Sequence, residues 1–452
     1  MSVPKGRPSD NEKVLFSPRN AMKALALCSA LMLAPCALAL AQEQSAGGPP
    51  SFGPPLPDHV HGGTAITEVF GDGQKLTAIA IGYDEEIDDS AISPHAFSVE
   101  GRTITRVYAN TSAEPSETGR NGRFVLIELS PDDDGAVVFG SVGRDVVRKD
   151  PSATITQVGS VTTVSGETYR PTDVAIPITS TMNLIVDDFD QQVFSDPATG
   201  DVVEYNLYVP EDYDPSKSYP LVLFMHDVGV TSAEVDTTLR QGLGAVIWAS
   251  PSEQAKHEAF VLAPQFAVQV AGDDSEASSW AQTTVDLLAQ ISNRYSIDQN
   301  RLYTTGQSGG AMLSLAIMIE HPDLFAAGVI VAGQWDPAKV APLANTRQWI
   351  VVSEGDAKAF PTENEMTAVY EGLGTKVARA TWSGLSTPQE FDTRVAAMEA
   401  EGAPINYTVL AKGTVVPEGQ DDNAGSNHIN TWRIAYTIEG IRDWLFKQVR
   451  PD

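Results

Sequence analysis

The first part of the chain consists of short segments in which hydrophobic residues alternate with smaller ones. Between residues 60 and 175 these segments are rich in Val, Ile and Thr and are separated by Gly, Asp and Pro. In KLTAIAIGY, for example, Ile79, Ile81 and Tyr83 alternate with smaller residues, as in a strand with one buried face. No helical pattern intervenes, and the regular spacing predicts a β-sandwich of immunoglobulin (Ig) type.

A different pattern begins at about residue 180. Three expected strands come first, and the turn DPATGD joins the first two. Strands then alternate with helices, and continuous apolar runs such as AAGVIVAG are typical of strands buried on both faces. The order predicts an α/β domain with a mostly parallel sheet over residues 180–452. The expected helices are SWAQTTVDLLAQISNRY, GAMLSLAIMIEH, ENEMTAVYEGLG, TPQEFDTRVAAMEAEG and, last, NTWRIAYTIEGIRDWLF.

The N-terminal residues 1–41 have the features of a secretory signal peptide. From Met22 the chain has one lysine, an apolar core and the small residues Ala39-Leu40-Ala41 before Gln42. The alternative is a transmembrane anchor, but the small-residue end favours cleavage. Met1 and Met22 both remain possible starts. Residues 42–59 are rich in Gly, Pro and Ser and predict a flexible leader, so we expect a secreted or periplasmic protein.

Composition narrows the kinds of partner. The 452 residues include 30 Lys and Arg against 59 Asp and Glu, and without residues 1–41 the net charge becomes −32. Such a surface repels nucleic acid and anionic membranes. Cys28 and Cys36 both lie in the expected signal peptide, which leaves no disulfide, thiolate metal site or cysteine nucleophile. With no zinc spacing or nucleotide fingerprint, we expect neither metal nor cofactor. The oligomeric state stays open.

One serine stands between glycines in TTGQSGGAML, residues 304–313, where an expected strand ends and an expected helix begins. A serine on such a turn adopts a strained backbone that projects its hydroxyl, and Gly306 and Gly310 permit close packing beside it. The first amides of the following helix, including that of Gly309, suit a developing oxyanion. Gly-x-Ser-x-Gly is weakly specific alone, and its position makes Ser308 the candidate nucleophile.

A serine nucleophile needs a histidine as its base. In α/β-hydrolases the chain order is serine, acid, histidine, and only His321 and His428 follow Ser308. His321 ends the helix that Ser308 begins, roughly 20 Å away at about 1.5 Å per residue. His428, in DDNAGSNHINTW, is expected in the loop before the last helix and is therefore the candidate base.

The acid of the triad should follow a strand between these two positions. The segment WIVVSEGDAKAFP supplies Glu354 and Asp356. Asp356 is preferred because Glu354 is still near the strand end and Gly355 makes the turn. Glu354, Glu363 and Asp422 remain alternatives.

The second oxyanion donor is expected in the loop after the third strand of the α/β domain, LFMHDVGV. The amide of Asp227 or of Val228 would act together with that of Gly309. His226 is expected to shape this loop rather than to serve as the base.

At this point several segments resemble a known group of proteins. They are YPLVLFMHDVG, AFVLAPQF, IDQNRLYTTGQSGGAM, HPDLFAAGVIVAGQWD, IVVSEGDAKAFP and SNHINTW. They are similar to secreted α/β-hydrolases related to polyhydroxybutyrate depolymerases, feruloyl esterases and predicted peptidases, over about residues 195–448. Some members carry an Ig-like domain before the catalytic one, which matches residues 60–175. The resemblance implies a serine esterase with Ser308, Asp356 and His428 as its triad and an ester substrate, small or polymeric.

Two positions depart from the family pattern. The family usually has His-Gly at the oxyanion loop, whereas this chain has His226-Asp227. A carboxylate beside a forming oxyanion opposes catalysis unless its side chain points away. Gly309 stands where a bulkier residue is common, so a wider pocket is expected. Trp280 and Trp335 are candidates to line the acyl or alcohol site, with core positions as the alternative.

Three functions remain in competition. The leading hypothesis is an ester hydrolase that works through an acyl-enzyme. The second is a serine peptidase of the prolyl-oligopeptidase-like type, although no propeller domain is present to gate peptides. The third is a non-catalytic binding protein with a relic hydrolase fold, which the intact Ser308, Asp356 and His428 argue against and Asp227 supports.

Overall fold

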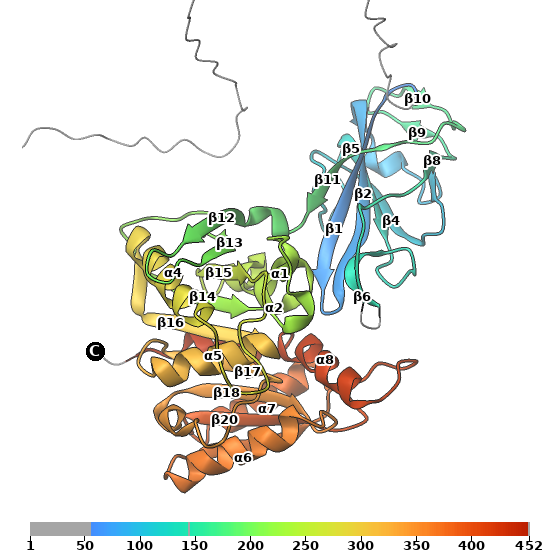
Figure 1. Cartoon of the computed structure of the whole chain (residues 1–452). Coiled ribbons are helices and arrows are strands. Elements are labelled where there is room, and N and C mark those ends of the chain that lie inside the picture. Colours follow the sequence, from blue (N-terminus) through green and yellow to red (C-terminus); the bar gives the residue numbers. More distant parts are fainter. Residues whose placement is uncertain (1–55, 143–144, 451–452) are drawn as a thin grey trace, which may run out of the picture. The chain divides into compact units, whose positions relative to one another are not determined.

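The computed structural model describes residues 56–142 and 145–450 (Figure 1). The expected signal peptide and nearly all of the expected leader lie outside the described residues. By their contacts, residues Pro54–Asp452 form one compact unit. This unit contains an all-β part and an α/β part, each built on its own main sheet.

The all-β part is a set of mostly antiparallel strands in the order β11-β1-β2-β5-β4, with β6 pairing to β2 and β7. The strands are β1 (Val60–Phe70), β2 (Gly73–Ile87), β4 (Ile104–Asn110), β5 (Gly122–Leu129), β6 (Val137–Val142), β7 (Asp145–Arg148) and β11 (Ile178–Asn183). Smaller sheets pair β3 (Phe97–Val99) with β8 (Ile155–Gln157) and β9 (Val161–Thr162) with β10 (Thr168–Tyr169). Because β11 pairs with β1, this part ends several residues after the expected boundary of 175–180.

Strand β2, whose alternating residues predict one buried face, is buried on both faces. Ile79, Ile81 and Tyr83 belong to the main core of the all-β part, as expected. Ala78 and Ala80, on the other face, are also buried, in a second small cluster. The large residues of this second cluster are Ile66, Tyr108 and Leu126. The alanines are therefore small because large side chains cover them, not because that face meets water.

The α/β part contains a nine-stranded sheet in the order β12-β13-β15-β14-β16-β17-β18-β20-β19. The strands are β12 (Asp190–Ser195), β13 (Val202–Tyr208), β14 (Tyr219–Met225), β15 (Phe260–Gln265), β16 (Ile297–Gln307), β17 (Ala327–Val331), β18 (Gln348–Ser353), β19 (Val377–Trp382) and β20 (Ile405–Leu410). The pairs β12–β13 and β13–β15 are antiparallel and the others parallel. The fold expected from the sequence, an α/β-hydrolase preceded by an Ig-like sandwich, is confirmed.

Helices cover both faces of this sheet. They are α1 (Thr237–Arg240), α2 (Leu243–Val246), α3 (Pro251–Gln254), α4 (Trp280–Arg294), α5 (Gly309–Glu320), α6 (Ala359–Gly372), α7 (Pro388–Glu399), α8 (Ala424–Ala435) and α9 (Glu439–Phe446). Residues of α4, α5 and α6 share one core with Leu221, Leu223 and Met225 of β14. Residues of α7, α8 and α9 share the other core with Val222 and Phe224, so β14 is buried on both faces.

The helix expected after Asn430 is in fact two helices. α8 begins at Ala424 and ends at Ala435, and α9 follows from Glu439. The side chain of Asn423 accepts a hydrogen bond from the Ser426 amide and so caps α8 earlier than expected. His428 consequently lies inside α8, and the prediction that it lies in a loop was wrong.

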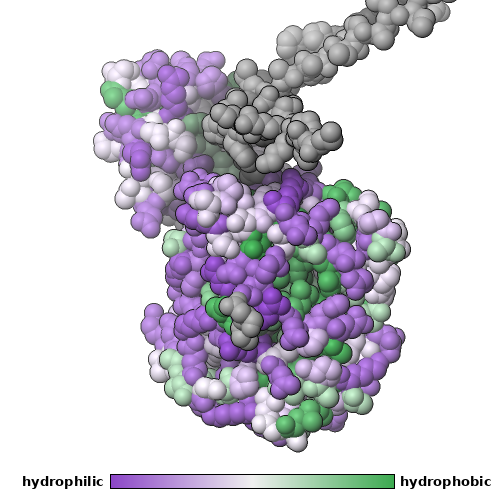
Figure 2. Space-filling model, turned by 90° about the vertical axis from the view of Figure 1, so that its left-hand side faces the viewer, coloured by the Kyte–Doolittle hydropathy of each residue, from purple (hydrophilic) through white to green (hydrophobic). Residues whose placement is uncertain are grey.

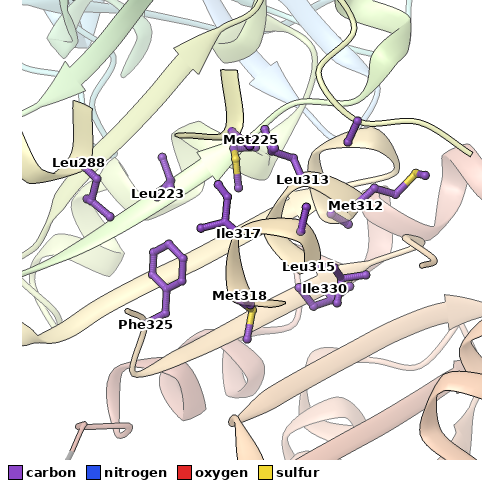
Figure 3. Packing of buried hydrophobic residues seen from close by; sticks show 14 of the residues in the cluster. Leu223, Met225, Leu288, Met312, Leu313, Leu315, Ile317, Met318, Phe325 and Ile330 are labelled. Atoms are coloured by element: carbon purple, nitrogen blue, oxygen red, sulfur yellow. The ribbon is translucent and has the colours of Figure 1, made fainter. Parts of the chain in front are cut away.

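Helix α5 is apolar all round because it is enclosed on every side. Ten of its twelve residues, Gly309 to Met318, are buried. In Figure 3, Leu313 and Ile317 extend toward Met225 and Leu223 of β14. A helix of this kind belongs in the interior, and burial fixes the end of α5 that follows Ser308.

One face of the molecule is largely polar. The face in Figure 2 is mostly hydrophilic, with hydrophobic residues in smaller patches. Within residues 56–142 and 145–450, no helix is both long and apolar enough to cross a bilayer.

Candidate active site

Ser308 occupies the sharp turn between β16 and α5. Its backbone angles, φ 50° and ψ −120°, lie where non-glycine residues are rarely found. The flanking glycines are needed for close approach. A Cβ on Gly306 would lie 2.4 Å from the Gly310 carbonyl carbon, and one on Gly310 would lie 2.0 Å from the Met225 oxygen. The structure thus holds Ser308 strained and projecting, as the sequence predicts.

His428 and Asp356 complete a chain of hydrogen bonds that begins at Ser308. His428 Nε2 lies 2.8 Å from Ser308 Oγ, and His428 Nδ1 lies 2.5 Å from Asp356 Oδ2. Because an ionised carboxylate only accepts, Nδ1–H donates to Asp356, and Nε2 is left to accept the serine proton. The three residues come from the ends of β16, β18 and the start of α8, and only the fold brings them together.

Asp356 is held as an anion. Burial opposes its ionisation, but hydrogen bonds from His428 and from the amides of Ala359 and Lys358 outweigh burial and lower its pKa below the ordinary value. Both amides donate to Oδ1 at 3.0 Å, which leaves Oδ2 for His428. The acid is therefore oriented by backbone as well as charged.

The other three carboxylates considered from the sequence bind elsewhere. Their hydrogen-bond partners are the Lys412 amide for Glu354, the Gly333 amide for Glu363 and the Asn427 side chain for Asp422. Of the four candidates, the geometry brings only Asp356 to His428.

His226 ties down the loop after β14. Its ring is buried, and burial lowers its pKa, so the imidazole is neutral. Nδ1–H donates to the Asp227 carbonyl at 2.7 Å, and Nε2 accepts from the Phe266 amide at 2.9 Å. Since the C=O and N–H of a trans peptide point in opposite directions, the Val228 amide faces away from His226.

Val228, rather than Asp227, faces Gly309. The Val228 nitrogen lies 3.3 Å and its Cγ2 lies 2.4 Å from the position a Cβ on Gly309 would take. The geometry therefore favours Val228 over Asp227 as the second amide donor. It also corrects the expectation of a wider pocket, because the Val228 side chain fills the space that Gly309 leaves.

The Asp227 carboxylate has its own hydrogen-bond donors. Oδ1 accepts from the Gly229 amide at 2.8 Å and caps a short 3₁₀ turn, and Oδ2 accepts from Gln307 at 3.0 Å. Gln307 immediately precedes Ser308, so Asp227 links the loop after β14 to the strand that carries the serine. This role was not foreseen from the sequence.

Two hollows meet at Ser308 and His428, which line both. The first, of about 300 Å³, is named the hairpin hollow because the β1–β2 and β6–β7 hairpins contribute to it. Its lining includes Asp72, Phe139, Asp227, Trp432 and Arg433. The second, of about 440 Å³, is the acid-loop hollow; its lining includes Val228, Asp273, Met312, Gln334 and Lys358. A scissile bond at Ser308 would thus have space on both sides, one for each half of a substrate.

The two tryptophans predicted to bind substrate line neither hollow. Trp335 is buried in the core on the α5 side of the sheet, and Trp280 packs against that core with its ring 6.1 Å from that of Phe266. Trp432, which was not predicted from the sequence, lines the hairpin hollow instead. Its spacing from His428 could have predicted this position. Trp432 follows His428 by four residues, and residues four apart on a helix share a face.

Comparisons with known families cover both parts of the chain. Residues 62–170 match the esterase Ig-like N-terminal domain. Residues 281–367, which include Ser308 and Asp356, match the prolyl oligopeptidase family.

Two individual proteins add to these matches. A solved structure of a thermostable esterase is 28% identical, covers 86% of this chain and 100% of its own, and superposes with a TM-score of 0.74. Acetylxylan esterase A of Emericella nidulans is 26% identical over 96 residues, 18% of this chain and 32% of its own length. The chain thus spans about a third of that relative. Together the comparisons confirm the resemblance to esterase-like hydrolases of the serine hydrolase superfamily with an Ig-like domain.

Proposed function

We propose that the protein is an exported serine esterase that cleaves carboxylic esters through Ser308, His428 and Asp356. The observation that carries the proposal is the unbroken hydrogen-bond chain from Ser308 Oγ through His428 to Asp356, which begins at a strained turn. The esterase names of its relatives support the choice of ester over other acyl substrates. Export rests on the sequence of residues 1–41 alone.

In this mechanism His428 Nε2 takes the proton of Ser308 while the serine oxygen attacks the ester carbonyl. The imidazolium that forms is stabilised by the Asp356 carboxylate. His428 then gives the proton to the leaving alcohol, and an acyl-enzyme remains. In the second half-reaction His428 activates a water, and the tetrahedral intermediate collapses to free Ser308 and the carboxylic acid.

The amides of Gly309 and Val228 would hold the negative oxygen of both intermediates. Gly309 is the first residue of α5, so the positive end of that helix supports the same charge. Removal of one oxyanion donor typically lowers kcat by about a hundredfold to a thousandfold. The rigid support that His226 and Asp227 give to this loop would keep both donors in place before the substrate arrives.

A second candidate is a serine peptidase, favoured by the match of residues 281–367 to the prolyl oligopeptidase family. The same three residues would then cleave amides. The two hollows leave room for either chemistry, so substrate assays must separate them.

The test is hydrolysis of p-nitrophenyl esters of graded acyl length and of peptidyl p-nitroanilides by the mature protein, beside Ser308→Ala. Ester cleavage that disappears in the variant is the expected result. Cleavage of anilides with no cleavage of esters would reject the esterase in favour of the peptidase. Cleavage of neither would favour a non-catalytic role.

A further inference from the structure

The hairpin hollow is shared between the two parts of the chain. Asp72 lies in the turn between β1 and β2, and Phe139 lies on β6, both in the Ig-like part. They line the same hollow as Ser308 and His428 of the catalytic part. A substrate bound at Ser308 that extends into this hollow would therefore contact the Ig-like residues directly.

Ion pairs and hydrogen bonds fix these hairpins against the catalytic part. Arg148, on β7, donates to Asp236 at 2.7 Å. Arg240 donates to the Gln74 side chain at 2.8 Å. At the tip of the β1–β2 turn, a Cβ on Gly71 would lie 3.2 Å from the Arg433 Cβ, so the turn packs closely on α8. The wall that Asp72 provides is thus held in place.

The charged groups of this hollow are suited to hydroxyl groups. Arg433 donates to Asn430 through Nη1, and its guanidinium carries further N–H donors. Asp72 pairs with Lys75 through Oδ2, at 3.1 Å, and its carboxylate keeps further acceptor sites. Asp72 lies close enough to oppose the lowering of the Arg433 pKa by burial. An acceptor and a donor thus border the same space, and a hydroxyl both donates and accepts.

Other chemistries fit less well. A substrate carboxylate would be attracted by Arg433 but would also meet Asp72 and Asp227 on the same lining, whose two negative charges oppose it. A plain hydrocarbon would remove water from Asp72 and Arg433 without replacing the lost hydrogen bonds, which is unfavourable. Phe139 and Trp432 supply apolar surface for the ring or chain that carries the hydroxyls.

We propose that the hairpin hollow is the subsite for a hydroxyl-bearing half of the ester substrate, with Asp72 of the Ig-like part and Arg433 of α8 as its specificity-determining residues. The proposal rests on the esterase function proposed above and adds a substrate class to it. It gives the Ig-like part a role in substrate selection.

The experiment compares ester pairs that differ only in hydroxyl groups. Monoacetylated methyl xyloside and cyclohexyl acetate differ in hydroxyl groups on the alcohol half. Methyl quinate and methyl cyclohexanecarboxylate differ in hydroxyl groups on the acyl half. The wild type should show a higher kcat/KM for the hydroxylated member of at least one pair. Asp72→Ala and Arg433→Met should each reduce that preference about tenfold, which corresponds to about 1.4 kcal/mol for the loss of one hydrogen bond to a charged group.

Controls distinguish a failure of the proposed subsite from a failure of the proposed esterase function. Asp132→Ala removes an exposed carboxylate from another turn of the Ig-like part and should leave the preference unchanged. Esters cleaved with no hydroxyl preference, or with one that neither variant reduces, would overturn the subsite and leave the esterase intact. If the wild type cleaves no ester, the esterase fails, and titration calorimetry of Ser308→Ala with methyl xyloside tests the subsite alone. Absent binding, or binding that Asp72→Ala does not weaken, would then overturn it.

Discussion

Nδ1 of His428 lies 2.5 Å from Oδ2 of Asp356, although the two residues are 72 positions apart. The carboxylate fixes the imidazole so that Nε2 faces Ser308, and it would stabilise the positive charge that forms when the serine proton moves. Glu354, two residues before Asp356, binds the Lys412 amide instead. The pair therefore offers a matched comparison.

We expect Asp356→Asn to lower kcat about ten-thousandfold, because an amide donor at Nδ1 favours the wrong imidazole tautomer. Glu354→Gln should change kcat by less than about threefold, since that carboxylate contacts no member of the triad. Both are measured by steady-state ester hydrolysis. Equal losses in the two variants would remove Asp356 from its proposed role.

The Asp227 carboxylate should support catalysis although its charge lies near the oxyanion loop. Asp227→Gly removes the cap on the Gly229 amide and the bond to Gln307, and we expect kcat to fall about tenfold as the Val228 amide loses its fixed position. Asp227→Asn keeps an acceptor for Gly229 and should retain most activity. A rise of kcat in Asp227→Gly would show instead that the carboxylate opposes the oxyanion.

Gly309 and Val228 should be energetically coupled. Gly309→Ala places a methyl group 2.4 Å from Val228 Cγ2, and we expect it to destabilise the protein by about 1–3 kcal/mol. Val228→Ala in the same chain should recover much of this loss, because it removes the group that clashes. Urea unfolding of both single variants and the double variant measures the coupling. Additive effects would mean that the two side chains do not meet.

Glu363 should make stability depend on pH. Burial raises its pKa well above the ordinary 4.5, and nearby Asp356 adds to the effect. The folded protein keeps this carboxyl protonated while the unfolded chain ionises it, so the free energy of unfolding decreases as pH rises above about 4.5 until the folded pKa is passed. Glu363→Gln keeps an oxygen for the Gly333 amide and removes the titration.

Thermal unfolding at pH 4 and pH 8 tests this prediction. The Tm of Glu363→Gln minus that of the wild type should be larger at pH 8. The same difference at both pH values would show that Glu363 titrates alike in the folded and unfolded chain. Glu365→Gln, on the same helix but with an exposed side chain, serves as the control.

The sequence by itself determined the features that depend on residues close together in the chain. Apolar runs and their spacing predicted the strands β14, β16, β17 and β18 and the buried helix α5. Glycines on either side of Ser308 predicted the strained turn, because a Cβ on Gly306 would meet Gly310 only four residues later. The order of residues along the chain was enough to select His428, since it left no other histidine within reach.

Only the tertiary structure decided which groups meet across the fold. Four carboxylates satisfied the sequence pattern, and the packing of α8 beside the end of β18 brought Asp356 to His428. Packing likewise placed Trp335 in the core, set Val228 against Gly309 and brought the hairpin of Asp72 to the hollow beside Ser308. These contacts join residues that are far apart in the chain, and their distances depend on how all the intervening elements pack. A local sequence pattern therefore cannot predict them.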